Sequence, residues 1–231
     1  HDNIFYTALP RFMRLLDEYN IRCTFFVIGR DLQNFQKRAL IKQLLNQGHE
    51  IANHTLNHRR SFSRLTIEDK EKEIKEAHVL ICKMLKYTPS GFRAPGFDIS
   101  IDIFPILEKY GYLYDSSIIP VLSPAFLRTV QRWLFRNKRI NPTYFGTCGY
   151  IGHCRIIPSL PVQQHIERNF SIHEVSVTTV PPLYIPFHAS FIYALWNGGV
   201  GRWFFKYSLQ FLIRHNLPVN YIFHLAELSD P

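Results

Sequence analysis

The chain of 231 residues is long enough for one large domain, and its 46% hydrophobic and 19% charged residues are ordinary for a globular protein with a buried core. No apolar run reaches the roughly 18–20 residues that cross a bilayer, which argues against a membrane-spanning segment in this chain. The net charge of +9 is uneven, since residues 123–231 carry 10 Lys or Arg and only 4 Asp or Glu. That balance favours an anionic partner, with general solubility as the alternative interpretation.

Helices and strands alternate in the first 120 residues. Apolar periodicity, capping signals and Pro or Gly turns predict helices at 5–19, 31–47, 67–86 and 101–110, and strands at 23–29, 49–54, 90–97 and 112–117. The helix that ends near Lys86 begins with a capping box, Thr66-x-x-Asp69. This alternation predicts an α/β fold with βα units around a parallel sheet, and active-site groups belong at the carboxyl ends of its strands.

The second half is less regular. Residues 123–139 predict an amphipathic helix whose polar face carries several arginines and no acid. Such a helix suits an anionic membrane surface, and the alternative is an ordinary surface helix with a basic face. The segment from Arg202 to Arg214 repeats the mixture of aromatic and cationic residues and favours the membrane interpretation.

The sharpest chemical signal is His54-Thr-Leu-Asn-His58. Two histidines four residues apart on a helical turn face the same way, so both imidazoles can reach one cation. Imidazole suits zinc above all, with cobalt, nickel, iron and manganese as alternatives. The pair alone is a weak signal, because catalytic metal sites usually have a third ligand and an open position for water.

Three further residues lie at predicted strand ends. Arg93 precedes a Pro-Gly turn and could hold a carboxylate, although such an Arg is often only a surface residue. Asp115, in Tyr-Asp-Ser-Ser, could equally be a turn cap. The apolar run of the predicted strand VNYIFHLAEL ends on His224, which could act as a general acid, or be a core histidine with one satisfied nitrogen.

In this order and spacing, the four signals resemble the successive motifs of the polysaccharide deacetylase family (carbohydrate esterase family 4, the NodB-homology domain). The flanking segments LLDEYNIRCTFFVIG, GHEIANHTLNH and GFRAPGF are similar to that family as well. The resemblance runs from about residue 5 to 118 and returns at 172–231, so a single catalytic domain over residues 1–231 is expected.

The resemblance implies a distorted (β/α) barrel of the seven-strand type and a divalent metal held by His54 and His58. It implies hydrolysis of an N-acyl group, with Arg93 paired to the catalytic base and Asp115 setting the charge and geometry of the site. His224 would protonate the leaving amine. Pro95 and Gly96, in the turn after Arg93, are assigned to substrate binding.

One family motif has no counterpart in the sequence. The first motif is a strand that ends in an Asp pair, which supplies the general base and the third metal ligand. The only carboxylate near the expected place is Asp2, which has no strand before it. The sequence therefore predicts a barrel missing its first strand in an N-terminally truncated domain, and the alternative is a protein that has lost its base.

The functional hypothesis is a deacetylase or deformylase of an amino sugar, lipid-linked or in a polysaccharide. The segments EVSVTTVPPLYIPFHASF and NYIFHLAEL look closer to the branch that handles lipid-linked sugars, which suits a cytoplasmic location at the inner membrane face with peripheral membrane association. The alternatives are an extracytoplasmic deacetylase of a wall glycan and a non-catalytic barrel that binds carbohydrate or lipid. Nucleic-acid binding is not expected, since no known nucleic-acid motif is present.

Overall fold

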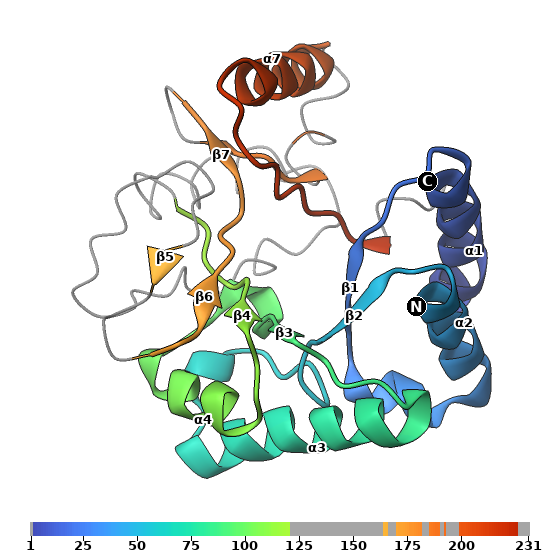
Figure 1. The fold of residues 1–231 in the computed structure, drawn as a ribbon, viewed down its shortest axis with the longest axis vertical. Coiled ribbons are helices and arrows are strands. Elements are labelled where there is room, and N and C mark those ends of the chain that lie inside the picture. The colour runs from blue at the N-terminus through green and yellow to red at the C-terminus, as the bar shows by residue number, and fades with distance from the viewer. Residues whose placement is uncertain are drawn as a thin grey trace.

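The computed structural model describes residues 2–120, 164–165, 170–181, 185–189, 192 and 199–225. Its helices are α1 (Asp2–Glu18), α2 (Phe35–Asn46), α3 (Ile67–Leu85), α4 (Phe104–Lys109) and α7 (Val200–Arg214). Its strands are β1 (Thr24–Val27), β2 (Glu50–Asn53), β3 (Gly91–Phe92), β4 (Tyr114–Asp115), β5 (Gln164–His165), β6 (His173–Glu174), β7 (Thr179–Val180) and β8 (Ile185–Pro186). Figure 1 shows the strands on the inside of an arc, with α1 to α4 around its outside.

Six strands form one sheet in the order β1-β2-β3-β4-β6-β5. The strands β1, β2, β3, β4 and β6 run parallel to one another, and β5 pairs antiparallel with β6 at the end of the sheet. The register places Val27 beside Asn53, Asn53 beside Phe92, and Asp115 beside Glu174. The predicted α/β fold with a parallel sheet is thus confirmed, and the carboxyl ends of its strands lie together along one edge.

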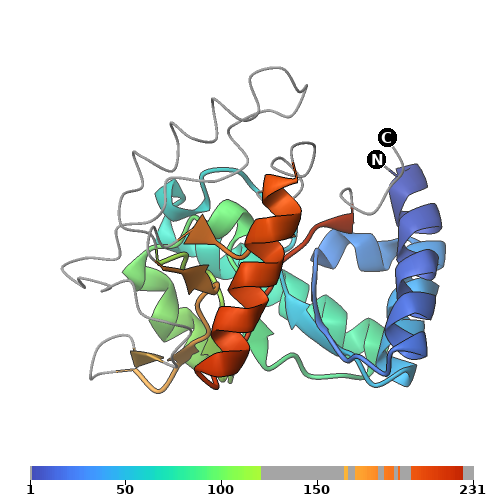
Figure 2. The ribbon, with the colours of Figure 1, turned by 90° about the horizontal axis from the view of Figure 1, so that it is seen from above.

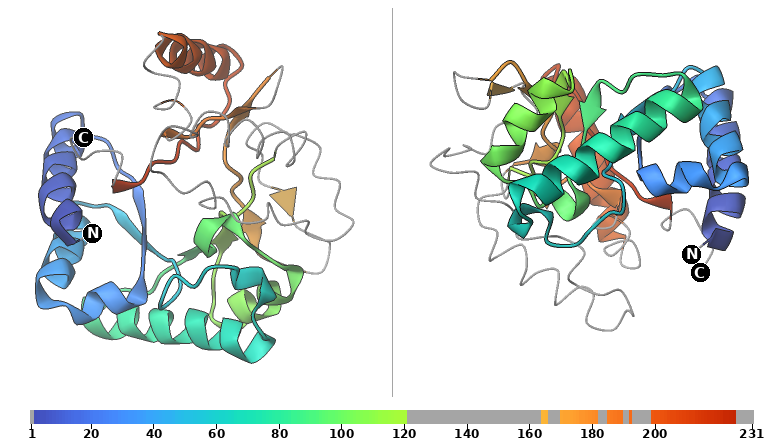
Figure 3. Two further views of the ribbon diagram at one scale, coloured as in Figure 1. Left: turned by 180° about the vertical axis from the view of Figure 1, so that it is seen from behind. Right: turned by 90° about the horizontal axis from the view of Figure 1, so that it is seen from below.

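The second part of the chain adds a smaller layer. β7 and β8 form a two-stranded antiparallel sheet, and a single parallel bridge joins His188 to Ile222. The views from above and below place α3 and α7 on opposite sides of the molecule, and the segment after α7 runs back toward β1 and α1 (Figures 2 and 3). Among the described residues no strand pairing joins β1 to β5 at the other end of the sheet, so closure into a barrel remains a prediction.

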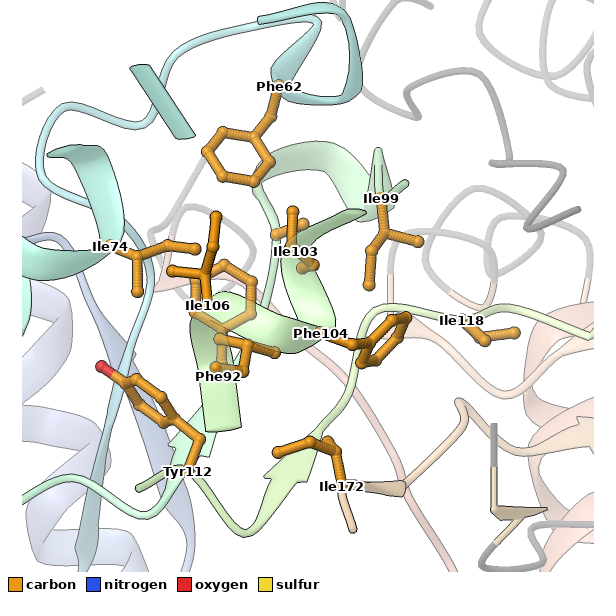
Figure 4. Packing of buried hydrophobic residues seen from close by; sticks show 12 residues of the cluster. Phe62, Ile74, Phe92, Ile99, Ile103, Phe104, Ile106, Tyr112, Ile118 and Ile172 are labelled. Atoms are coloured by element: carbon orange, nitrogen blue, oxygen red, sulfur yellow. The ribbon is translucent and has the colours of Figure 1, made fainter. Parts of the chain in front are cut away.

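Apolar side chains bury the inner faces of the helices in separate clusters. Between α3, α4 and the strands β3 and β4, the side chains of Phe62, Phe92, Phe104 and Tyr112 are at most 3% exposed and pack with seven isoleucine and leucine neighbours of the same cluster (Figure 4). A second cluster joins α1 and α2 to β1 and β2 through Leu9, Leu44, Val27 and Ile51, among others. These clusters hold the helices against the sheet, because each buried aliphatic or aromatic side chain stabilises the fold by about 1.5–3 kcal/mol.

Two local predictions about the helices are borne out in detail. Thr66 accepts a hydrogen bond from the amide of Asp69 at 3.2 Å and caps α3, as the sequence pattern indicates. At the other end Lys86 has a left-handed φ of 56°, which ends the helix. The predicted amphipathic helix at 123–139 lies outside the described residues.

The predicted strand VNYIFHLAEL is wrong for the part that the structure describes. Of residues 219–225, only Ile222 has a β-bridge, and its partner is His188. The apolar alternation that suggested a strand instead packs side chains of this segment against α1 and α7: the rings of Phe223 and Phe12 lie 4.5 Å apart, and Tyr221 joins the α7 cluster.

Candidate active site

A cavity of roughly 1520 Å³ runs along β1, from Thr24 and Glu50 at the amino ends of the strands to His54 and Arg93 at their carboxyl ends. One wall consists of apolar side chains from α1 and β1, such as Phe12 and Phe25. The polar groups that reach the cavity include His54, His58 and Arg93, and the extended segment of residues 219–225 closes the far side. An apolar cavity with a few converging polar groups is the usual form of a small-molecule site.

His54 follows directly on β2, and its ring orientation is fixed by a backbone carbonyl. Nδ1 of His54 lies 2.7 Å from the carbonyl oxygen of Arg93. Because a carbonyl can only accept, Nδ1 carries the proton and donates it, which leaves the lone pair of Nε2 available to a ligand. Burial, followed by the neighbouring His58, lowers the pKa of His54 to about 3, so the imidazole is neutral at physiological pH.

His58 lies beside His54, but the predicted helical turn between them is wrong. The amides of Leu56 and Asn57 donate to the backbone carbonyl and side chain of Glu73 on α3, at 2.9 and 2.8 Å, rather than to carbonyls four residues back. Thr55 and His58 both adopt left-handed backbone conformations, with φ of 63° and 54°. The two imidazole centroids are nevertheless 4.8 Å apart, and burial lowers the pKa of His58 as well.

Arg93 is a buried cation at the end of β3. Its Nε donates to the carbonyl of Ser116 at 2.7 Å, and Nη2 donates to the Ser116 hydroxyl at 2.6 Å. The guanidinium carbon lies 3.9 Å from the ring centroid of Phe26. Burial lowers the pKa of Arg93 to about 10, while Asp115 and Glu174 act in the opposite direction. The pairing of Arg93 with a catalytic base stays a prediction.

Asp115 is fully buried and has a carboxyl neighbour that the sequence analysis missed. The register of β4 and β6 places Glu174, itself 1% exposed, directly beside it. Burial is the main cause that raises the pKa of both carboxyls, and for Glu174 the charge of Asp115 adds to it. Two adjacent buried carboxyls disfavour a second negative charge, which favours a proton shared between Asp115 and Glu174. The only sequence signal is an acid directly before the alternation Val175-Ser176-Val177.

The remaining predicted site residues lie around the cavity mouth. His224 is exposed and lines the cavity, and its ring centroid is 5.3 Å from that of the buried His188. His54, His58 and His224 all line the cavity, so the three imidazoles face one space. Gly96, with a φ of 62°, lines the cavity, whereas Pro95 is buried.

The donor set fits a divalent metal in part. His54 presents Nε2 with its tautomer fixed by a backbone carbonyl, an arrangement common to metal-binding histidines, and His58 is adjacent. Across the part of the chain that the structure describes, no group of three or more His, Cys, Asp or Glu side chains is placed to hold a metal ion. The described residues thus provide two of the three protein ligands that a catalytic zinc site usually has.

The family model of polysaccharide deacetylases matches residues 2–114. Residues 2–114 belong to the polysaccharide deacetylase family. The residues matched by this deacetylase model include His54, His58 and Arg93 and reach as far as β4.

Several known proteins are similar to part of the chain. A peptidoglycan-N-acetylglucosamine deacetylase of Bacillus cereus is 37% identical over 106 residues, which cover 46% of this chain and 48% of that protein. A peptidoglycan deacetylase of Helicobacter pylori is 25% identical over 127 residues, or 54% of this chain and 42% of the relative. The chain thus spans about half the length of the curated relatives that it matches. Among solved structures, peptidoglycan deacetylase PdaC of Bacillus subtilis (mutant D285S) has a TM-score of 0.43 at 24% identity, covering 57% of this chain and 58% of that one.

Proposed function

We propose that this chain is the catalytic domain of a metal-dependent hydrolase that removes an N-acyl group from an amino sugar of a glycan. The observation that carries the proposal is the pair of imidazoles at the cavity, 4.8 Å apart, with Nδ1 of His54 held by the Arg93 carbonyl. Support for the substrate class comes from the names of the Bacillus cereus and Helicobacter pylori relatives, both of which are deacetylases of peptidoglycan.

In this proposal each residue has a separate task. His54 and His58 hold a divalent metal, which when bound polarises the acyl carbonyl and acidifies its water. The buried charge of Arg93 favours negative charge at the carboxyl ends of the strands, where an oxyanion develops during acyl transfer. His224, exposed at the cavity mouth, donates a proton to the leaving amine. Gly96 allows the substrate to approach the backbone closely, since it has no side chain.

The third metal ligand in this proposal is a carboxylate on a further strand beside β1. In the described sheet β1 pairs only with β2. The amide of His54 donates to the carbonyl of Val27, the last residue of β1, at 3.0 Å, so a parallel strand added to β1 would end close to His54. Carboxylate with two histidines is a common ligand set of catalytic zinc.

Metal content is the decisive measurement. We would measure zinc and cobalt in this chain and, where the gene continues upstream, in the extended chain. Near-stoichiometric metal in the extended chain, lost in His54→Ala and in His58→Ala, is the expected result. His78→Ala is the matched control, because His78 is a partly buried histidine whose Nδ1 bonds Tyr112 at 3.0 Å outside the cavity. If neither protein binds metal, the proposal fails and a non-catalytic binding barrel becomes the better interpretation.

The identity of the substrate needs a separate assay. Release of acetate from acetylated chitooligosaccharides and from peptidoglycan would support a polysaccharide substrate, and release of formate or acetate from a lipid-linked amino sugar would support the lipid-linked branch. The metal-loaded protein is compared with His224→Gln, which removes the proposed proton donor. Unchanged turnover in this variant would contradict the role given to His224.

We further propose that the protein binds the surface of an anionic membrane, and α7 supports this. The helix contains no acidic residue, and its outer face carries Arg202, Lys206 and Arg214. Next to these cations, Trp203 and Ile213 are 64% and 67% exposed. No helix of the described residues is long and apolar enough to cross a membrane. Cations with exposed apolar side chains suit a helix that lies in the lipid interface. A location at the cytoplasmic face of the membrane is also part of this proposal.

Vesicle sedimentation tests the membrane proposal. The protein is expected to sediment with phosphatidylcholine vesicles that contain phosphatidylglycerol and to stay in solution with pure phosphatidylcholine. Lys206→Gln together with Arg214→Gln should abolish sedimentation, while Arg59→Gln together with Lys109→Gln, which removes two exposed cations elsewhere, should not. Equal sedimentation of all three proteins would contradict a role for α7.

A further inference from the structure

The peptide group between Arg93 and Ala94 is hydrogen-bonded on both sides. Its carbonyl, on Arg93, accepts from Nδ1 of His54 at 2.7 Å. Its amide, on Ala94, donates to the hydroxyl oxygen of Ser117 at 2.8 Å. A peptide group is planar, so any rotation of the amide away from Ser117 also turns the carbonyl away from His54. The position of the Ser117 hydroxyl therefore bears directly on the orientation of the imidazole.

Ser117 is in turn oriented by Asp115. The hydroxyl of Ser117 donates to Oδ1 of Asp115 at 2.6 Å, and its amide donates to Oδ2 at 3.2 Å. A serine hydroxyl has one proton, and here it is donated to Asp115. The hydroxyl oxygen can therefore only accept from the Ala94 amide. Both side chains are almost fully buried, at 0% and 1% exposure, and water has little access to replace either partner.

Glu174 completes the chain of contacts from the neighbouring strand. Its Oε1 accepts from the amide of Ile118 at 2.9 Å, which ties it to the residue after Ser117. Its Oε2 is buried, and no donor among the described residues reaches it. The pairing of Asp115 with Glu174 in the β4–β6 register holds the two carboxyls side by side.

We infer that Ser117, Asp115 and Glu174 are positioning residues for His54, acting through the peptide group between Arg93 and Ala94 to fix the Nδ1–H tautomer. The inference rests on the proposed function, because the tautomer matters as the one that turns Nε2 toward a metal. Hydrogen bonds in a series polarise one another, and loss of such outer contacts typically weakens metal binding about 10–100-fold. None of the three side chains needs to touch metal or substrate.

Nitrogen NMR of the metal-free protein tests the inference without any assay of activity. The ¹⁵N shifts of His54 are expected to show a single tautomer protonated at Nδ1, with a coupling across the hydrogen bond to the Arg93 carbonyl. Ser117→Ala should give a mixture of the two tautomers and weaken cobalt and zinc binding about 10–100-fold. Ser90→Ala is the matched control, since its hydroxyl donates to Glu50 at the opposite end of β3, and it should change neither readout.

Glu174 provides a conservative rescue. In Glu174→Gln the carbonyl oxygen can still accept from Ile118 and the amide can still donate to Asp115, so both readouts should match the wild type. Glu174→Leu removes both contacts and should resemble Ser117→Ala. If either disruptive variant fails to fold, the wild-type spectrum still decides, because an unprotonated Nδ1 in His54 would overturn the inference.

The outcomes separate this inference from the proposed function. A mixture of tautomers in Ser117→Ala, in a protein that binds no metal, would contradict the metal site and support the positioning of His54. A single unchanged tautomer in folded Ser117→Ala, with metal affinity equal to the wild type, would overturn the positioning and leave the metal site intact.

Discussion

The parallel strands bury polar side chains at both ends, and the two ends use them differently. At the amino ends, the carboxylate of Glu50 accepts from Thr24, Ser90 and Tyr114 at 2.6–2.9 Å, so one strand is tied to three others. At the carboxyl ends, Arg93 donates to the Ser116 carbonyl, and the carboxyls of Asp115 and Glu174 accept from the amides of Ser117 and Ile118. The Glu50 cluster is complete in itself, whereas the cluster at the other end continues to an imidazole that faces the cavity.

This difference teaches where stability and chemistry lie in the fold. The hydrogen bonds of Glu50 join β2 to β1, to the residue before β3 and to β4, so that cluster keeps the strands together. The carboxyl-end cluster contains three ionisable groups with displaced pKa values, which is common at functional sites. We therefore expect substitutions at the amino ends to change stability alone, and substitutions at the carboxyl ends to change both stability and metal binding.

The largest expected effect follows from Arg93→Met. The variant leaves the negative charge of the Asp115–Glu174 pair buried without its cation, which should lower the free energy of unfolding by about 3–5 kcal/mol. Urea unfolding measures this loss. Arg59→Met is the control, since the ion pair of Arg59 with Asp69 is more than 40% exposed on both sides and should change stability by less than about 1 kcal/mol. Equal losses of stability in both variants would contradict a stabilising role of the buried Arg93 at the carboxyl ends.

The second-largest expected effect is a pH dependence of stability caused by Glu174. Burial raises the pKa of Glu174 well above 4.5, so the folded protein keeps a proton that the unfolded chain releases. Stability should therefore fall as the pH rises above about 4.5, by at most about 1.4 kcal/mol per pH unit for one proton. Below that pH both states are protonated and the dependence disappears. Glu174→Gln cannot ionise, so urea midpoints across this range should fall less steeply; parallel curves for variant and wild type would contradict the shared proton.

The smallest effect, about 1–2 kcal/mol, is expected for Glu50→Ala. The variant leaves three donors without their acceptor, but the carboxylate lines the cavity and water can reach part of the cluster. Metal affinity should equal that of the wild type, measured by titration with cobalt. A drop in affinity as large as that of Ser117→Ala would mean that the two ends do not differ in function.

The sequence predicted the elements from α1 to α4 because their signals are local. Apolar periodicity and the Thr66 cap act over a few residues, and tertiary contacts did not overrule them. Local signals also predicted that strands end near His54 and Arg93. The helical turn at His54–His58 was wrong because Glu73, a residue of α3, takes the amides that would have formed it.

Glu174 could not be predicted, because its role depends on strand register. Asp115 and Glu174 are 59 positions apart in the chain, and only the pairing of β4 with β6 brings them together. An acid beside a short apolar alternation gives no sign of its partner. The strand predicted around His224 failed for a related reason: its apolar side chains were recognised, but they pack against α1 and α7 instead of continuing a ladder.

The loop that carries the two imidazoles has its own consequence for how quickly the site can act. Thr55 and His58 are held at positive φ, a conformation that costs about 1–3 kcal/mol for each such residue. Contacts of the loop with Glu73 and Asn53 keep it there, since Thr55 donates to Asn53 Oδ1 at 2.8 Å. These hydrogen bonds come from the protein itself, so the loop has little conformational entropy left to lose when a ligand binds. We expect a site that loads at a rate set by diffusion into the cavity rather than by folding of its ligands.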